Sequence, residues 1–382
     1  MKATKYLLFL ALLTLLPLAV ASPEEYVGAE KCKMCHKDVY EEWKESGHPY
    51  IIRTAEEAKE AGLPLPPGYT WDDISHVIGG YKWKARYLDK NGYFITKTKA
   101  GKNGSNQYNL ETKTWSDYHP GEIKKYNCGK CHTTGYSPEG HMHGMEGIVG
   151  TWVYHGVQCE VCHGPGSEHI AKGGDKTLII KDTSSALCGK CHIRGDKNTI
   201  PAKGGFIRHH EQYNELLASP KKDFECVACH DPHKKSELSI KVGCASCHAE
   251  EGNEFNGSLM QKAGVKCIDC HMAEAAKSAI ARSTFQGDVK THLFKINIDP
   301  DAKMFTEDGK FALGYLTVEY ACLKCHTDKD KSWALKYAEG IHALKEVPKP
   351  PAPPAAKPTC GPTLLLLLAS LTALLIGLKR RK

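Results

Sequence analysis

The sequence is short of the residues that build an ordinary apolar core. Aromatic residues make up only 8% of the 382 residues, whereas glycine occurs 35 times. A chain of this length is long enough to bury a sizeable core. The composition instead predicts a loop-rich fold whose interior is supplied in part by something other than side chains.

Outside the two ends of the chain, positive and negative charges are nearly balanced. The formal net charge is +7, but the terminal segments discussed below hold six basic residues and no acid. The rest of the chain has 45 basic and 44 acidic residues. This balance leaves no excess of positive charge for a polyanion, and we expect no nucleic-acid partner.

Cysteine, in contrast, is far more frequent than in ordinary globular proteins. Sixteen of the 17 cysteines form eight copies of one pattern, Cys-x-x-Cys-His, which we number motifs 1 to 8 in chain order. Their cysteines are Cys32 and Cys35, Cys128 and Cys131, Cys159 and Cys162, Cys188 and Cys191, Cys226 and Cys229, Cys244 and Cys247, Cys267 and Cys270, and Cys322 and Cys325. The histidines that close them are His36, His132, His163, His192, His230, His248, His271 and His326.

This spacing predicts covalently bound haem. Two thiols three positions apart can add to the two vinyl groups of one porphyrin, and the adjacent histidine then reaches the iron from the proximal side. A structural zinc site would join two cysteine pairs and would need no histidine after each pair. A disulfide framework likewise requires no particular residue after each cysteine pair. Because a histidine follows all eight pairs, the sequence predicts eight haems c, which supply much of the core.

Several stretches resemble the multihaem cytochromes related to hydroxylamine oxidoreductase and its tetrahaem electron acceptor, cytochrome c554. The resemblance is carried by residues 26–49 (YVGAEKCKMCHKDVYEEWKESGHP), CGKCHTTGY from Cys128, GVQCEVCHGPGSEH from Gly156, CVACHDPH from Cys226, CIDCHM from Cys267 and THLFKI from Thr291. It implies that His48, His169, His233 and His292 bind iron on the distal side. No Cys-x-x-Cys-Lys occurs, so the lysine-ligated catalytic haem of some nitrite reductases is not expected.

Further distal ligands can be proposed from the remaining histidines. Twelve histidines lie outside the motifs, which is enough for two histidines on every iron. His342 follows the last motif in a helical-looking stretch, and His209 or its neighbour His210, which both precede motif 5, should supply another ligand. The others are expected among His76, His119, His141, His143 and His155, each of which is as readily a surface histidine.

The N-terminus carries the pattern of a secretory signal. Lys2 and Lys5 precede an apolar run over residues 6–20, and Ala19-Val20-Ala21 is a small-x-small cleavage site. Residues 1–21 are therefore predicted to be a signal peptide, and the protein to be exported. The family resemblance agrees, because it implies that haem is attached outside the cytoplasm.

The C-terminus predicts a membrane tether. Residues 348–359 form a proline-rich linker, and Cys360-Gly361-Pro362 begins a segment with an apolar run over 363–378 and a basic end. The run has 16 residues, fewer than the roughly 20 that span a bilayer. Residues 360–382 are either a short tail anchor or a cleaved sorting signal with a lipid on Cys360; they resemble archaeal signals of the Cys-Gly-Pro type. Either places the protein on the outer face of the cytoplasmic membrane or on the cell surface.

Between these ends, residues 22–347 are predicted to form one cytochrome domain that is mainly α-helical and loop-rich, with little regular structure per haem. A region without motifs breaks this pattern. Residues 81–89 and 93–98 alternate around Asn91-Gly92, a strong hairpin signal, and residues 107–115 could add a third strand. We expect a small β-hairpin around 80–115, within an insert over 76–116, which acts as a cover over a haem edge or as a partner-docking flap.

Three functions are consistent with these features. The leading one is an electron carrier between membrane or soluble redox partner proteins and an extracellular acceptor, because iron held by two histidines has no open position. The second is an octahaem oxidoreductase that acts on hydroxylamine, nitrite or tetrathionate at one five-coordinate iron. The third is a conducting filament of stacked subunits; other oligomers are possible, but a membrane tether argues against free polymerisation.

Overall fold

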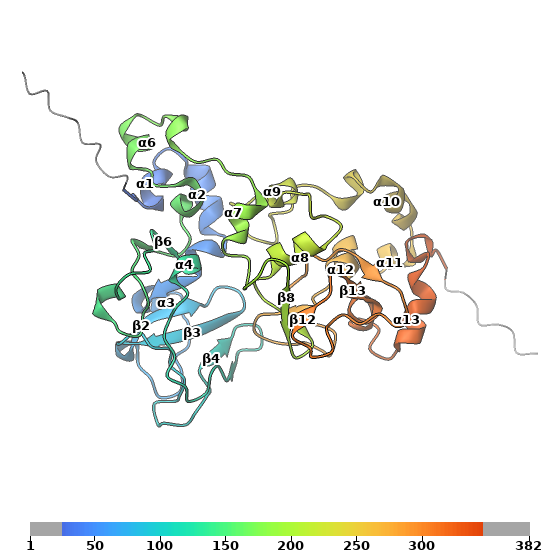
Figure 1. Ribbon diagram of the computed structural model, residues 1–382, viewed down its shortest axis with the longest axis horizontal. Coiled ribbons are helices and arrows are strands. Elements are labelled where there is room, and N and C mark those ends of the chain that lie inside the picture. The colour runs from blue at the N-terminus through green and yellow to red at the C-terminus, as the bar shows by residue number, and fades with distance from the viewer. Residues whose placement is uncertain (1–24, 347–382) are drawn as a thin grey trace, which may run out of the picture.

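The computed structural model describes residues 25–346 (Figure 1). The signal peptide expected at 1–21, the linker at 348–359 and the segment at 360–382 lie outside the described residues. Within 25–346, every helix is too short or too polar to cross a bilayer.

The helices are short, and the longest have eight residues. The α-helices are α1 (Ala29–Lys33), α2 (Lys37–Lys44), α3 (Ala55–Glu60), α4 (Gly129–His132), α5 (Cys159–His163), α6 (Ser167–Ala171), α7 (Ser185–Gly189), α8 (Gln212–Ala218), α9 (Cys226–Cys229), α10 (Ala249–Phe255), α11 (Leu259–Lys262), α12 (Cys267–His271) and α13 (Lys331–Ala338). Single turns are η1 (His48–Tyr50), η2 (Trp71–Asp73), η3 (Met142–Gly144), η4 (Lys176–Leu178), η5 (Cys244–Ser246), η6 (Glu319–Leu323) and η7 (Ile341–Ala343).

Each Cys-x-x-Cys-His motif lies in or beside one helical turn. The backbone N–H of His36 donates to the carbonyl of Cys32 at 2.9 Å, and His230 makes the same bond to Cys226 at 2.9 Å. Residues three and four apart share one face of a helix. The turn therefore places both thiols and the imidazole of a motif on the same side, as one porphyrin requires.

The N-terminal half is built on an antiparallel five-stranded sheet in the order β1-β2-β3-β4-β5. Because side chains alternate along a strand, the sheet packs on both faces. Ile52, Ile78 and Leu88 join one apolar cluster, and Val77 and Tyr87 join another. Its strands are β1 (Ile52–Thr54), β2 (Ile74–Gly79), β3 (Lys84–Asp89), β4 (Gln107–Asn109) and β5 (Thr114–Ser116).

This sheet is larger than the hairpin expected around 80–115, because β1 and β2 come from upstream. The Asn91-Gly92 turn does form: the Gly92 N–H donates to the Asp89 carbonyl at 3.0 Å, and Gly92 has a φ of 83°. Its second arm does not become a strand. Phe94 makes one isolated bridge to Leu88, and its N–H donates to the carbonyl of Lys124 at 2.9 Å. Farther along β3, Arg86 pairs with Gln107 of β4 instead.

The C-terminal half contains a four-stranded sheet in the order β10-β9-β8-β12, which the sequence did not predict. Ile207 in this sheet packs with Leu293 and Leu316 in the largest apolar cluster of that half. Strands of two to four residues are too short for alternation to be read from sequence. They are β8 (Ile200–Lys203), β9 (Phe206–Arg208), β10 (Ala276–Lys277) and β12 (Phe311–Ala312), while β6 (Thr133–Thr134) pairs with β7 (Tyr154–His155) and β11 (Ile296–Asn297) with β13 (Leu316–Thr317).

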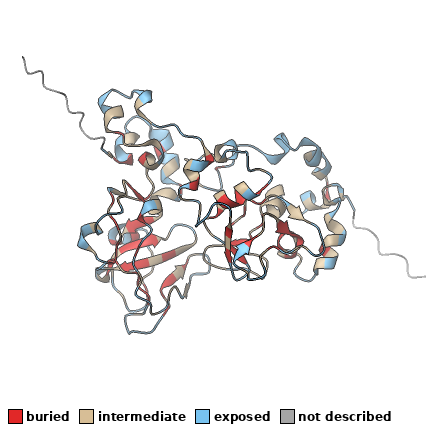
Figure 2. Cartoon of the chain, viewed as in Figure 1, coloured by how far each residue is buried: buried red, intermediate tan, exposed pale blue. Residues whose placement is uncertain are grey.

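Figure 1 shows the five-stranded sheet on one side of the molecule and α10 to α13 on the other, with α7, α8 and α9 between them. Burial follows the strands rather than the helices: the sheets are mostly buried, whereas the motif helices are largely half-buried or exposed (Figure 2). Side-chain packing therefore holds the sheets, and the motif helices need another source of stability.

We predict that Leu88→Ala lowers the free energy of unfolding by about 2–5 kcal/mol, because Leu88 is 0% exposed between the strands and the cluster beneath them. Urea unfolding of the holoprotein, followed by circular dichroism, measures this. Ile123→Ala is the control, since Ile123 is 91% exposed and its truncation should change little. Equal effects of the two substitutions would contradict the assigned core.

Candidate haem-iron sites

A single connected cavity of about 2950 Å³ runs through the described residues. Pockets for one small molecule usually measure roughly 300–1,000 Å³. The cavity is lined by at least one cysteine from each of motifs 2 to 8. Its size and its lining fit several porphyrins packed together.

Five motif histidines face a second histidine, and the distance between the two rings is similar in all five pairs. Two imidazoles that bind one metal from opposite sides, with bonds of roughly 2 Å, have ring centroids about 6 Å apart. The five observed distances run from 5.8 to 6.5 Å, and they belong to His36–His169, His48–His192, His163–His233, His230–His292 and His271–His342. The donor set and its spacing thus fit haem iron with two histidine ligands.

Hydrogen bonds donated by Nδ1 orient three of these rings. Nδ1 of His163 donates to the carbonyl of Ile180 at 2.8 Å, and Nδ1 of His271 donates to that of Phe294 at 2.8 Å. Nδ1 of His169 donates to the carbonyl of Asp175 at 2.9 Å. A proton on Nδ1 leaves the Nε2 lone pair free, so each ring presents Nε2 to the gap as an iron ligand would.

The histidine pairs connect segments that lie far apart in the chain. His48 follows motif 1 but faces His192 of motif 4, and His169 follows motif 3 but faces His36 of motif 1. His233 follows motif 5 and faces His163 of motif 3. Each bound iron would therefore link two motif segments.

Thiols of neighbouring motifs also meet. Cys32 of motif 1 and Cys159 of motif 3 share a hydrogen bond, which raises the pKa of Cys159. A hydrogen bond with Cys131 raises the pKa of Cys191, and one with Cys226 raises the pKa of Cys188. Motifs 2, 4 and 5 are thereby placed side by side. Porphyrins attached at these cysteines would lie close enough to exchange electrons.

Motifs 2, 6 and 8 differ, because no second histidine ring stacks on their histidines among residues 25–346. The ring of His326 lies 4.6 Å from that of Trp333. Nε2 of His248 lies 2.9 Å from Nζ of Lys221. Nδ1 of His132 is buried without a hydrogen-bond partner.

Basic side chains line the cavity at the motif 2 site. Burial, followed by the charges of Arg194 and Arg86, lowers the pKa of His132 to about 4. Burial lowers the pKa of Arg86 to about 10, and its guanidinium lies 3.4 Å from the ring centre of Tyr118. Burial and the charge of Arg86 also lower the pKa of Lys84. These cations line the large cavity, and none had been predicted from the sequence, since a lone lysine or arginine carries no motif signal.

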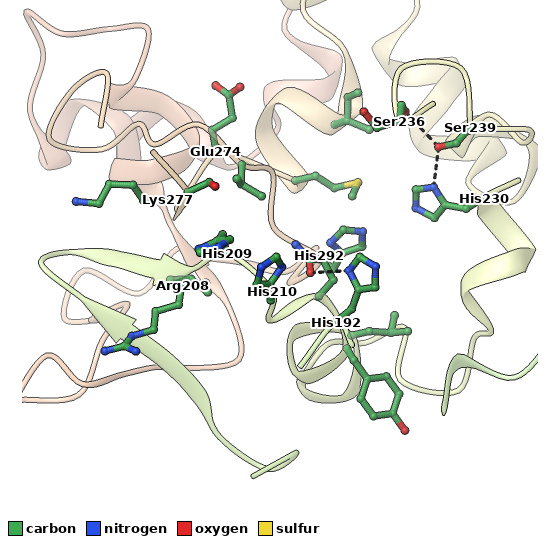
Figure 3. Close-up of a pocket in the computed structure, with 18 of the residues that line it drawn as sticks. His192, Arg208, His209, His210, His230, Ser236, Ser239, Glu274, Lys277 and His292 are labelled. Carbon is green, nitrogen blue, oxygen red and sulfur yellow. Dashed lines mark hydrogen bonds between the residues drawn. The ribbon is translucent and has the colours of Figure 1, made fainter. Parts of the chain in front are cut away.

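His209 and His210 line the same cavity, with ring centroids 4.0 Å apart. Figure 3 shows His210 on the side of His192 and His292, with His209 behind it toward Lys277. Of the other histidines considered as ligands, His76 and His155 contact each other through Nε2 atoms 3.1 Å apart, and His119 pairs with Glu122 at 2.7 Å.

Comparisons with known proteins agree with this geometry. The family model "Cytochrome c554 and c-prime" matches residues 31–64 and 90–164. The chain is 23% identical to the dissimilatory sulfite reductase MccA of Wolinella succinogenes over 74% of its length, and 29% identical to the multiheme cytochrome MtrA of Shewanella baltica over 30%. These matches cover 56% and 35% of the two relatives, so the chain spans about half of their length or less.

Two solved structures share the fold. The outer cell wall cytochrome OcwA superposes with a TM-score of 0.57 at 20% identity, over 81% of this chain and 86% of that one. The Wolinella succinogenes octaheme sulfite reductase MccA gives 0.60 at 18% identity, over 86% and 69%. The chain therefore shares the fold of these cytochromes, and residues 31–64 and 90–164 are similar to the cytochrome c554 and c-prime family.

We predict that His169→Asn converts one low-spin iron to high spin, because it removes the ring that faces His36. Electron paramagnetic resonance of the oxidised holoprotein measures the spin state, and a pyridine haemochrome assay should show the same haem content as the wild type. His119→Asn is the matched control, because His119 pairs with Glu122 and its φ of 47° suits asparagine. An unchanged spectrum for His169→Asn would remove His169 from the ligand set.

Proposed function

We propose that this protein is an exported electron carrier that holds eight covalent haems c and passes electrons between a donor at the membrane and an acceptor outside the cell. The main support is the set of five histidine pairs 5.8 to 6.5 Å apart, since iron closed by two histidines transfers electrons and binds no substrate. Haem supplies the one-electron chemistry; the chain holds, orients and spaces it.

The placement of the motifs favours a route through the molecule. The contacts between Cys32 and Cys159, Cys131 and Cys191, and Cys188 and Cys226 set motif 1 beside motif 3, and motif 4 beside motifs 2 and 5. Cys244 and Cys267 do the same for motifs 6 and 7. Motif 1, on α1, and motif 8, beside α13, stand at opposite ends of the molecule (Figure 1). These two ends are suited to meet redox partner proteins.

The location proposed for this route is the outer face of the cytoplasmic membrane or the cell surface. It is supported by the signal-like residues 1–21 and by the Cys-Gly-Pro segment 360–382. The likeness to a protein named as an outer cell wall cytochrome is in keeping with it. A tether at one end and an exposed motif at the other would let the carrier bridge a membrane donor and an external acceptor.

A second candidate is an oxidoreductase that acts on a small anion at motif 2. Two observations favour it: among residues 25–346 no second histidine ring stacks on His132, and the side chains of Lys84, Arg86 and Arg194 line the cavity nearby. One relative is named a dissimilatory sulfite reductase. Positive side chains would attract and orient an oxyanion, and the neighbouring motif 4 would deliver electrons.

Electron paramagnetic resonance with added ligands separates the two functions. For the carrier, we predict that nitrite, sulfite and hydroxylamine leave every signal of the oxidised holoprotein unchanged, because a carrier requires every iron to be closed by protein ligands. A high-spin signal that shifts with these ligands, and no longer shifts in Arg86→Gln, would contradict the carrier and establish the enzyme. Lys222→Ala, which changes an exposed cation, is the control.

For the tether, we predict that a chain ending at Thr359 moves from the membrane fraction to the soluble fraction with its haem content intact, because residues 25–346 contain no span. Cell fractionation with haem staining measures this. Cys360→Ala then separates the two kinds of tether: release follows only if a lipid on Cys360 holds the protein. A truncated chain that stays with the membrane would contradict the proposed tether.

A further inference from the structure

The histidine of motif 6 has an amine where five other motif histidines have a second imidazole. Nζ of Lys221 lies 2.9 Å from Nε2 of His248. The Nδ1 side of the same ring faces Glu251, whose Oε2 is 3.9 Å away. Nε2 is therefore the atom that faces the ligand side, and Lys221 occupies the position on that side.

Lys221 is held in this place by its own loop. Its N–H donates to the hydroxyl of Ser219 at 3.0 Å, and Ser219 is buried at the end of α8. The ammonium lies 5.0 Å from the ring centre of Phe224. No carboxylate of the described residues lies within ion-pair distance of Lys221, although acids are as common as bases in this part of the protein. The adjacent Lys222 points into solvent and is exposed.

We propose that the amine of Lys221 is the sixth ligand of the iron held at Cys244, Cys247 and His248. The protein then contains one histidine–lysine iron among its histidine–histidine irons. The inference rests on the proposed haem at motif 6, and it holds for the carrier and the enzyme alike. With Lys221 bound, the motif 6 iron has no position for an exchangeable ligand. The anion site of the enzyme alternative therefore stays at motif 2.

The chemistry of this step is simple. An ammonium has no lone pair, so Lys221 must lose one proton to solvent as its nitrogen forms the bond to iron; no electron is transferred. Two nitrogens on opposite sides of one iron lie about 4 Å apart. Nζ must therefore withdraw by about 1 Å from its place beside Nε2, a movement that the flexible four-carbon stem of lysine allows.

The competing explanation is that Lys221 forms an ion pair with a porphyrin propionate. Lys221→Arg distinguishes the two roles, because a guanidinium keeps the positive charge but stays protonated and cannot bind iron. Lys221→Ala removes both functions, and Lys221→His restores a nitrogen ligand. Lys222→Ala is the matched control on the neighbouring exposed lysine.

The test uses near-infrared magnetic circular dichroism of the oxidised full-length holoprotein, in which the low-spin charge-transfer band depends on the axial ligands. We expect a band of the histidine–amine class worth one haem in the wild type and in Lys222→Ala. It should disappear in Lys221→Ala and Lys221→Arg, each of which gains one high-spin haem, and should change to the histidine–histidine class in Lys221→His.

Two results would overturn the proposal: no amine-class band in the wild type, or wild-type spectra in Lys221→Arg. The pyridine haemochrome assay keeps this outcome separate from failure of the haem assignment. A full count of eight haems without the amine band removes Lys221 as a ligand, whereas a count below eight in the wild type contradicts the proposed function itself. If Lys221→Ala assembles poorly, Lys221→His and Lys221→Arg still decide the question.

Discussion

The fold is arranged around histidine pairs, each of which would hold one iron between two distant chain segments. The rings of His48 and His192, or of His163 and His233, come from different motif segments and stand about one iron's coordination distance from each other. Helices of four to eight residues are unstable on their own. Thioether bonds and iron coordination would supply the missing stability, so much of the folding free energy of the motif helices is cofactor-binding free energy.

The five-stranded sheet contributes in another way. Alternation along β3 sends Ala85 and Tyr87 into an apolar cluster and leaves Lys84 and Arg86 on the opposite face. That face lines the cavity beside the motif 2 site. The segment predicted as a cover or a docking flap therefore also carries two basic side chains to the proposed haem site of motif 2. A rigid sheet, whose other face packs through Val77 and Tyr87, positions these charges more accurately than a loop would.

The sequence predicted the features that depend on residues close together in the chain. Cys-x-x-Cys-His puts thiols and imidazole on one turn, and Asn91-Gly92 predicts its own turn. The histidine pairing could not be predicted, because the partner of His36 follows motif 3 and the partner of His192 follows motif 1. Strands of two or three residues, such as β10, leave no pattern to read. Lys84, Arg86 and Lys221 were missed for the same reason: only the tertiary fold places a single basic residue beside a motif histidine.

The charges around motif 2 bear on the choice between carrier and enzyme. Burial lowers the pKa of Lys84 and of Arg86, so each needs a nearby anion to keep its charge. The charge of Asp288 partly offsets the effect of burial on Lys84. Arg194 differs from both, because its side chain is 42% exposed and lies 3.9 Å from Glu211. The two candidate functions therefore differ at Arg86: a carrier would neutralise it permanently with a haem propionate, whereas an enzyme would leave its charge free for the substrate.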